Sequence, residues 1–134
     1  MTDLKQVSEL RRVLRLDIAQ REAALGEVLT RQRTLIEERD RLDQPLPQET
    51  PSFLEARAGL RHRVWRNERR RALNHQIALL RATEISRREA LQDLYGKDAA
   101  LSEIDQIAKR DRLAERRRTD LSRLLSETLR RQTS

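Results

Sequence analysis

Apolar residues recur along the first third of the chain at alternating spacings of three and four, the pattern of a coiled-coil helix. The pattern does not slip, and it predicts a helix from about residue 3 to residue 43 with Thr2 as its N-cap. Eight of the twelve residues in this row are apolar. The polar members either control the register or face a partner. We call the row the first seam: Leu4, Val7, Arg11, Leu14, Ile18, Arg21, Leu25, Val28, Gln32, Leu35, Arg39 and Leu42.

A second long helix is expected from about residue 52 to residue 131. All three prolines of the chain fall within residues 44–51, which predicts a loop between the two helices because proline disrupts a helix interior. The spacing of three and four starts again at Phe53, fails across residues 65–72, and resumes one residue out of step. After the slip the row consists of Leu73, Ile77, Leu80, Glu84, Arg87, Leu91 and Leu94.

The two rows predict an all-α fold, a single domain over residues 1–134 built as a two-helix antiparallel coiled-coil hairpin. In such a hairpin the numbers of paired residues add up to a constant, and a constant of 95 matches apolar residues with one another. In this register the first residues of the first helix lie beside residues near 94 of the second. Residues 97–131 should therefore extend beyond the first helix as an overhang. Glycine costs about 1 kcal/mol inside a helix, but we expect the second helix to continue through Gly96. The pairs that define this register are Leu42 with Phe53, Leu35 with Leu60, Ile18 with Ile77, and Leu4 with Leu91.

Composition supports long helices and adds a basic surface. Apolar residues make up 37% of the 134 positions and charged residues 38%, with one Phe, one Trp and one Tyr, which is too little bulky material for a compact globule. The net charge is +7, and its excess lies mainly on the second helix. Nucleic acid, an acidic membrane or an acidic protein could therefore be a partner. The charged N-terminus and the lack of a long apolar run predict a cytosolic protein.

No residue pattern predicts catalysis. The sequence has no cysteine and only three glycines, and it lacks a phosphate-binding loop, a zinc-protease motif and a nucleophile elbow. His62 and His75 have no acidic or cysteine residues at ligand spacing. We therefore expect no enzyme activity, no cofactor and no metal.

Seven arginines gather between residues 57 and 71, with Trp65 among them. This cluster is either a solvated helix face, a surface for an acidic protein, or a DNA-binding region. The string from Asn67 to Leu73 is only loosely similar to a basic-zipper region, which needs a parallel dimer. Trp65 either fills the coil where the spacing slips or anchors a partner.

Several strings resemble the flagellar type III export protein FliJ family and its injectisome relatives of the YscO type. They are residues 14–16 (LRL), residues 24–28 (ALGEV), residues 94–104 (LYGKDAALSEI), Arg110 and the charged stretch 112–118. Length, basic charge, the proline-broken tip and the longer second helix extend the resemblance over nearly the whole chain.

The resemblance implies a cytoplasmic, non-enzymatic stalk at the centre of the hexameric export ATPase ring. Such a stalk promotes ring assembly, reaches the membrane-embedded export gate and associates with the membrane only peripherally, through partners; some members also handle export chaperones. The tip would face the gate, and the overhang would sit in the ring. The implied contact residues are Leu46, Phe53, Leu54, Trp65, Arg69, Arg70 and Arg71 near the tip, and Leu101, Ile104, Leu121 and Leu125 on the overhang.

Two alternatives stay open beside the stalk. One is a basic coiled-coil adaptor that pairs through its overhang. The other is a coiled coil that binds nucleic acid through the arginine cluster, which the helix pairing makes unlikely.

Overall fold

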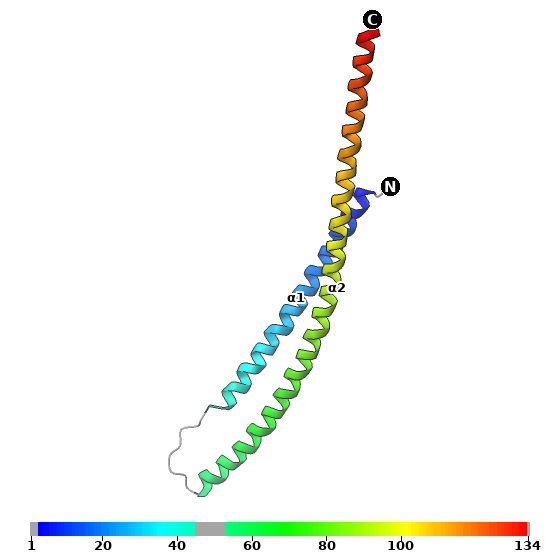
Figure 1. The fold of residues 1–134 in the computed structure, drawn as a ribbon. Helices are drawn as coiled ribbons and strands as arrows, with labels where there is room; N and C mark the ends of the chain where they lie inside the picture. The colour runs from blue at the N-terminus through cyan, green and yellow to red at the C-terminus, as the bar shows by residue number, and fades with distance from the viewer. Residues whose placement is uncertain (1–2, 45–52, 134) are drawn as a thin grey trace. The chain divides into compact units, whose positions relative to one another are not determined.

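The computed structural model describes residues 3–44 and 53–133, and these residues form two helices (Figure 1). Helix α1 spans Leu4–Leu42 and helix α2 spans Phe53–Thr133, so the second is about twice as long as the first. The predicted bounds agree with these to within two residues. Helix α2 continues through Gly96, as expected. Most of the predicted tip loop lies outside the described residues.

The cap of α1 differs from the expectation. The carboxylate of Asp3 accepts a hydrogen bond from the backbone N–H of Lys5 at 3.0 Å, and its carbonyl accepts the first helical bond from Val7. Asp3 is therefore the N-cap residue, a role its short carboxylate fills well. Thr2 lies outside the described residues.

Contacts divide the chain into two units, and we describe each by itself. Unit 1 joins Met1–Ile18 to Asp93–Ser134, and unit 2 is Ala19–Gln92. In both units a segment of α1 packs against a segment of α2. The first seam is the buried row of α1, since all its members except Arg21 are buried or partly buried.

An apolar cluster holds unit 2 together. Leu35 of α1 packs with Leu73 and Ile77 of α2, and Leu73 is completely buried. Partly buried apolar residues surround this group: Ile36, Leu42 and Leu80.

Polar contacts flank the apolar cluster of unit 2. Arg69 Nη2 donates to Glu38 Oε1 at 2.6 Å, and its Nε donates to the same oxygen at 3.1 Å. Arg70 pairs with Asp43, and Arg39 Nη1 donates to Asn74 Oδ1 at 3.1 Å. The residue numbers of these pairs add up to between 107 and 113, whereas the predicted register requires 95.

In unit 1 charged residues join the helices alongside the buried apolar residues Val7 and Ile18. Arg11 lies 3.6 Å from Asp98 and 3.9 Å from Asp105, and Arg15 lies 3.8 Å from Asp98. The numbers of these pairs add up to between 109 and 116. The predicted register is therefore wrong in both units, because charged pairs form that the apolar matching did not consider.

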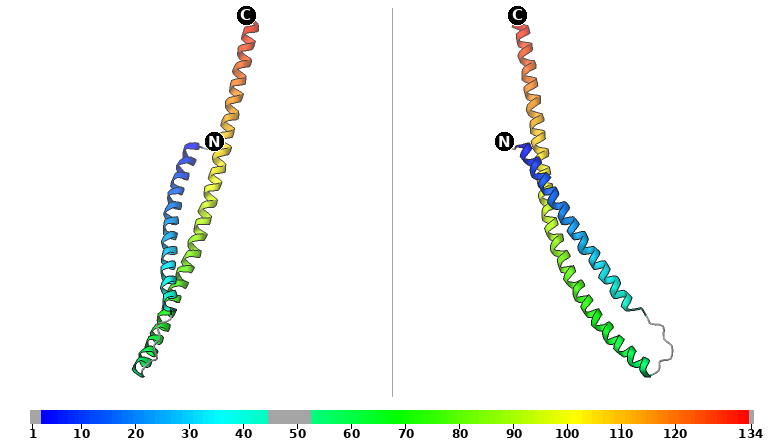
Figure 2. Two further views of the ribbon diagram at one scale, coloured as in Figure 1. Left: turned by 90° about the vertical axis from the view of Figure 1, so that its left-hand side faces the viewer. Right: turned by 180° about the vertical axis from the view of Figure 1, so that it is seen from behind.

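In the observed register the overhang starts later in the chain than predicted. Residues from Asp98 to Lys109 lie beside the first turns of α1, although the sequence predicted an overhang from residue 97. The whole stretch 111–133 is exposed, and Figures 1 and 2 show no second helix beside this orange to red part of α2. The overhang thus begins near residue 110.

Candidate partner-binding surfaces

The beginning of α2 exposes apolar and basic side chains together. Leu60, Val64 and Trp65 keep 61%, 52% and 51% of their surface exposed. These side chains are exposed because α1 ends at Leu42, and Leu42 packs beside the cluster around Leu73. Helix α1 therefore does not reach them. We call this region the tip-proximal surface; its exposed members are Arg57, Leu60, Arg61, Arg63, Val64, Trp65 and Arg71.

Trp65 does not fill the space between the helices. Half of its surface is exposed, and its ring centroid lies 5.5 Å from that of His62 with the planes inclined by 31°. An exposed tryptophan beside arginines is a typical anchor for a protein partner. Of the two alternatives for Trp65, its exposure argues against the filling of the coil.

The structure separates three arginines that the sequence grouped. Arg69 and Arg70 are turned to α1 and bound in ion pairs with Glu38 and Asp43, whereas Arg71 is exposed. Arg69 and Arg70 therefore hold the two helices together, and only Arg71 remains with the tip-proximal surface.

Three predicted contact residues lie at the edge of the described residues or beyond it. Phe53 and Leu54 begin α2, but their side chains are not among those described, and Leu46 lies outside the described residues altogether.

The predicted overhang residues also fall into two groups. Leu101 is partly buried, and with Leu10, Val13 and Leu14 it lines a shallow groove where α1 meets α2 in unit 1. Ile104 is 43% exposed on the part of α2 that lies beside α1. Leu121 and Leu125 lie beyond α1 and are 60% and 65% exposed. Together with Leu113, Leu124 and Leu129 they form an exposed apolar stripe, which we call the C-terminal stripe.

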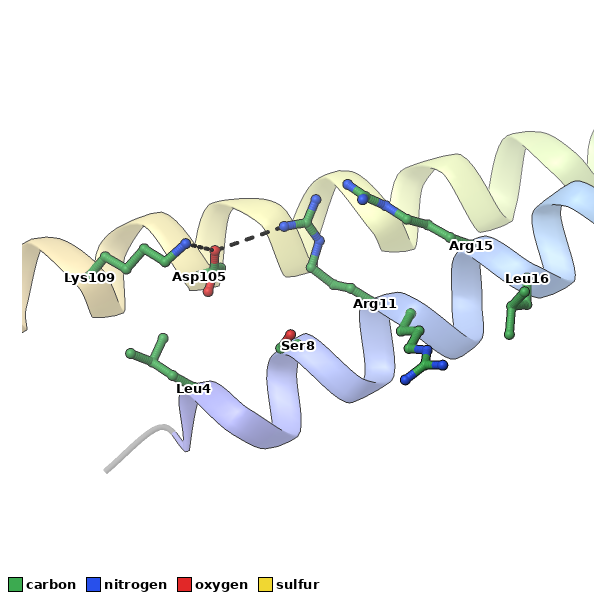
Figure 3. A pocket seen from close by; sticks show the side chains of 8 residues that line it. Leu4, Ser8, Arg11, Arg15, Leu16, Asp105 and Lys109 are labelled. Carbon is green, nitrogen blue, oxygen red and sulfur yellow. Dashed lines mark ion pairs between the residues drawn. The ribbon is translucent and has the colours of Figure 1, made fainter.

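A charged groove in unit 1 was missed by the sequence analysis. Asp105 lies at its centre, 2.9 Å from Lys109 and 3.9 Å from Arg11 (Figure 3). The side chains of Arg11 and Asp105 are only 21% and 14% exposed. The groove is lined by Leu4, Ser8, Arg11, Arg12, Arg15, Leu16, Asp105 and Lys109.

The sequence did contain a signal for this groove. Asp98 and Asp105 continue the spacing of three and four that runs through Leu91, Leu94 and Leu101. Two acids on the buried row of α2 call for a basic partner on the buried row of α1, and Arg11 is such a residue. A search for apolar pairs alone overlooks this match.

The described residues contain neither a metal-binding cluster nor a membrane-spanning stretch. Within residues 3–44 and 53–133, no cluster of histidine and carboxylate side chains has the arrangement of a metal site. Over the same residues, neither helix contains a stretch long and apolar enough to cross a membrane. What the structure offers a partner is a basic surface with an exposed tryptophan, and a separate apolar stripe.

Comparison of the sequence with protein-family models, with curated proteins and with solved structures finds no match.

Proposed function

We propose that this chain is a non-enzymatic, cytoplasmic component of a flagellar or injectisome type III export apparatus. In this proposal it folds as an antiparallel coiled-coil hairpin and forms the central stalk of the export ATPase ring. It promotes assembly of the ring and couples the ring to the export gate.

The main support is the excess length of α2. At 81 residues against 39, α2 has more length than α1 can cover. In unit 2 it leaves the tip-proximal surface uncovered, and in unit 1 it leaves the C-terminal stripe uncovered. A helix that exposes an apolar stripe binds a partner along that stripe, so each surface is suited to a different partner.

The C-terminal stripe is the surface that we assign to the ATPase ring. Its leucines gather on one side of the helix, as in an amphipathic helix that enters an apolar groove, and Arg117 is a charged residue among them, four residues from both Leu113 and Leu121. The tip-proximal surface is assigned to the gate, with Trp65 as its anchor and the exposed arginines contacting acidic groups.

Stimulation of the export ATPase from the same genome tests the stalk proposal. The unaltered chain should raise the hydrolysis rate and promote ring formation, and Leu121→Glu with Leu125→Glu should abolish both. Thr119→Glu with Ser126→Glu is the matched control, because it adds the same charge to neighbouring turns on a different side of the helix. No stimulation by a well-folded helical sample would refute the proposal.

Replacement of the aromatic residues near the tip tests the assignment of the gate. Phe53→Ala with Trp65→Ala should weaken binding to the cytoplasmic part of the gate protein without changing the helix content measured by circular dichroism. Unchanged binding would remove both residues from the contact surface.

A second candidate function is binding to nucleic acid, which is favoured by the exposed arginines of the tip-proximal surface. If that function holds, the logarithm of the binding constant for any DNA falls linearly with the logarithm of the salt concentration, with a slope set by the number of phosphates neutralised. Replacing Arg57, Arg61 and Arg63 by Gln would reduce that slope by roughly three. Absence of DNA binding at about 50 mM salt would exclude this function.

A further inference from the structure

Leu60, an exposed apolar residue of α2 in unit 2, matches Leu35 of the buried row of α1, and the exposed Val64 falls beside Gln32 of the same row. Leu60 and Val64 are 61% and 52% exposed because α1 ends before it reaches them. In the structure Leu35 packs against Ile77. In the register that pairs apolar residues, Leu60 would take the place of Ile77 opposite Leu35. This second register is defined by Leu35 with Leu60, Leu42 with Phe53, and Ile18 with Ile77.

The two registers are related by a shift that keeps the buried rows facing each other. Leu60 precedes Ile77 by 17 residues, and Phe53 precedes Arg70 by 17 as well. Buried positions recur every 3.5 residues on average in a coiled coil, so a shift of about 17.5 residues again places one row opposite the other. Five alternating steps of three and four add up to 17 or 18 residues, so a shift of 17 keeps residues such as Ile77 and Leu94 on one row.

Each register has its own source of stability. The observed register forms the ion pairs of Arg11 with Asp98 and Asp105, and of Arg69 with Glu38. It also leaves buried polar atoms without hydrogen-bond partners among the described residues, which costs free energy. These atoms are Arg11 Nε, Gln32 Nε2, Arg66 Nε, Arg70 Nε and Asp98 Oδ1. The second register would instead bury Leu60 and bring Arg11 opposite Glu84.

We infer that α1 occupies two discrete registers on α2: the charge-matched register seen here and an apolar-matched register displaced by about 25 Å. The occupant of the apolar face at Leu60 and Val64 is then α1 of the same chain. Ten residues, 43–52, connect the helices, and ten extended residues span up to about 35 Å, so the connection is long enough for both registers. The inference concerns the chain alone and does not depend on the export function.

Engineered cysteine pairs can distinguish the two registers, since the natural chain has no cysteine. Arg39→Cys with Asn74→Cys reports the observed register, in which Arg39 and Asn74 are hydrogen-bonded. Arg39→Cys with Ala56→Cys reports the apolar-matched register. Arg39→Cys with Asn67→Cys lies between the two and controls for random collisions, because neither register brings these positions together. The measurement is the rate of disulfide formation in the full-length chain.

Two sets of substitutions should move the populations in opposite directions. Asp98→Asn with Asp105→Asn should raise the rate of the 39–56 bond relative to the 39–74 bond by roughly fivefold, the ratio that the loss of one good ion pair produces. Salt at about 1 M should act in the same direction. Leu60→Ser with Val64→Ser should suppress the 39–56 bond to the rate of the 39–67 control. These two residues are exposed here, so the 39–74 bond should form as before.

Either of two results would overturn the inference. If the 39–56 bond never forms faster than the 39–67 control in the unaltered chain, in high salt or after Asp98→Asn with Asp105→Asn, then α1 has one register only. Circular dichroism of each variant, together with the 39–74 rate, shows that the helices are still paired. If Leu60→Ser with Val64→Ser leaves a fast 39–56 bond unchanged, the apolar face does not stabilise a second register, and the inference is equally wrong.

Discussion

The two units use the same kind of helix contact, but unit 1 adds partly buried charges to its buried apolar residues Val7 and Ile18. In unit 2 the centre of the contact is apolar, with Leu73 completely buried against Leu35 and Ile77. In unit 1 the corresponding rows bring Arg11 between Asp98 and Asp105. The difference separates two tasks. Apolar burial is strong but tolerates many alignments, whereas a charge that has lost much of its water requires its partner at one alignment.

The largest expected effect concerns the apolar contact in unit 2. Leu73→Ala should lower the free energy of unfolding by about 3 kcal/mol, because it removes a completely buried side chain and leaves a cavity. Urea titration followed by circular dichroism measures the loss. Leu79→Ala is the control, since Leu79 is 56% exposed and should change stability by less than about 0.5 kcal/mol. Equal effects of the two substitutions would show that Leu73 is not the centre of the contact.

An intermediate effect is expected from the charged contact in unit 1. Arg11→Ala removes the one base that contacts both Asp98 and Asp105, leaving them only Arg15 and Lys109, so stability should fall by about 1–2 kcal/mol. The same measurement with Arg11→Ala, Asp105→Ala and the double variant gives the coupling energy of the pair. That coupling should shrink in about 1 M salt. A coupling of zero at low salt would contradict a role for this pair in alignment.

The smallest expected effect comes from an ion pair at the edge of unit 2. Glu38→Ala removes the partner of Arg69, but both side chains are more than a third exposed and solvated. We expect a loss of about 0.5 kcal/mol, typical of an exposed ion pair. The comparison with Arg11→Ala then isolates the contribution of burial, since both substitutions break an ion pair between α1 and α2. A larger loss from Glu38→Ala than from Arg11→Ala would contradict the idea that the more buried charges of unit 1 contribute more to the alignment of the helices.

The local structure was predictable because it depends on nearby residues. Few glycines, prolines confined to residues 44–51 and the regular apolar spacing were sufficient to place both helices to within two residues. The buried row of α1 was also predictable, because a row spaced by three and four residues occupies one side of a helix. Its polar members Arg11, Gln32 and Arg39 are buried or partly buried, as their positions in the row predict, whereas Arg21 is exposed.

The candidate binding surfaces were predictable only in part. Trp65, Leu121 and Leu125 were named from the sequence and are exposed. Arg69, Arg70 and Leu101 were named too, but they lie at the contact between the helices and are not freely exposed. Which member of a basic or apolar group remains accessible depends on what the other helix covers, and that depends on the alignment of the two helices.

The amino-acid sequence by itself determined two long helices, the break between them and the side on which α1 is buried. Only the tertiary structure decided which residues of α2 that side meets. The physical reason is the repeat: identical spacing on both helices lets their buried rows face each other in several registers of similar apolar content. Arg11 with Asp98 and Asp105, and Arg69 with Glu38, tie the helices in one of them. These contacts join residues more than 30 positions apart, so they become visible only when both helices are in place.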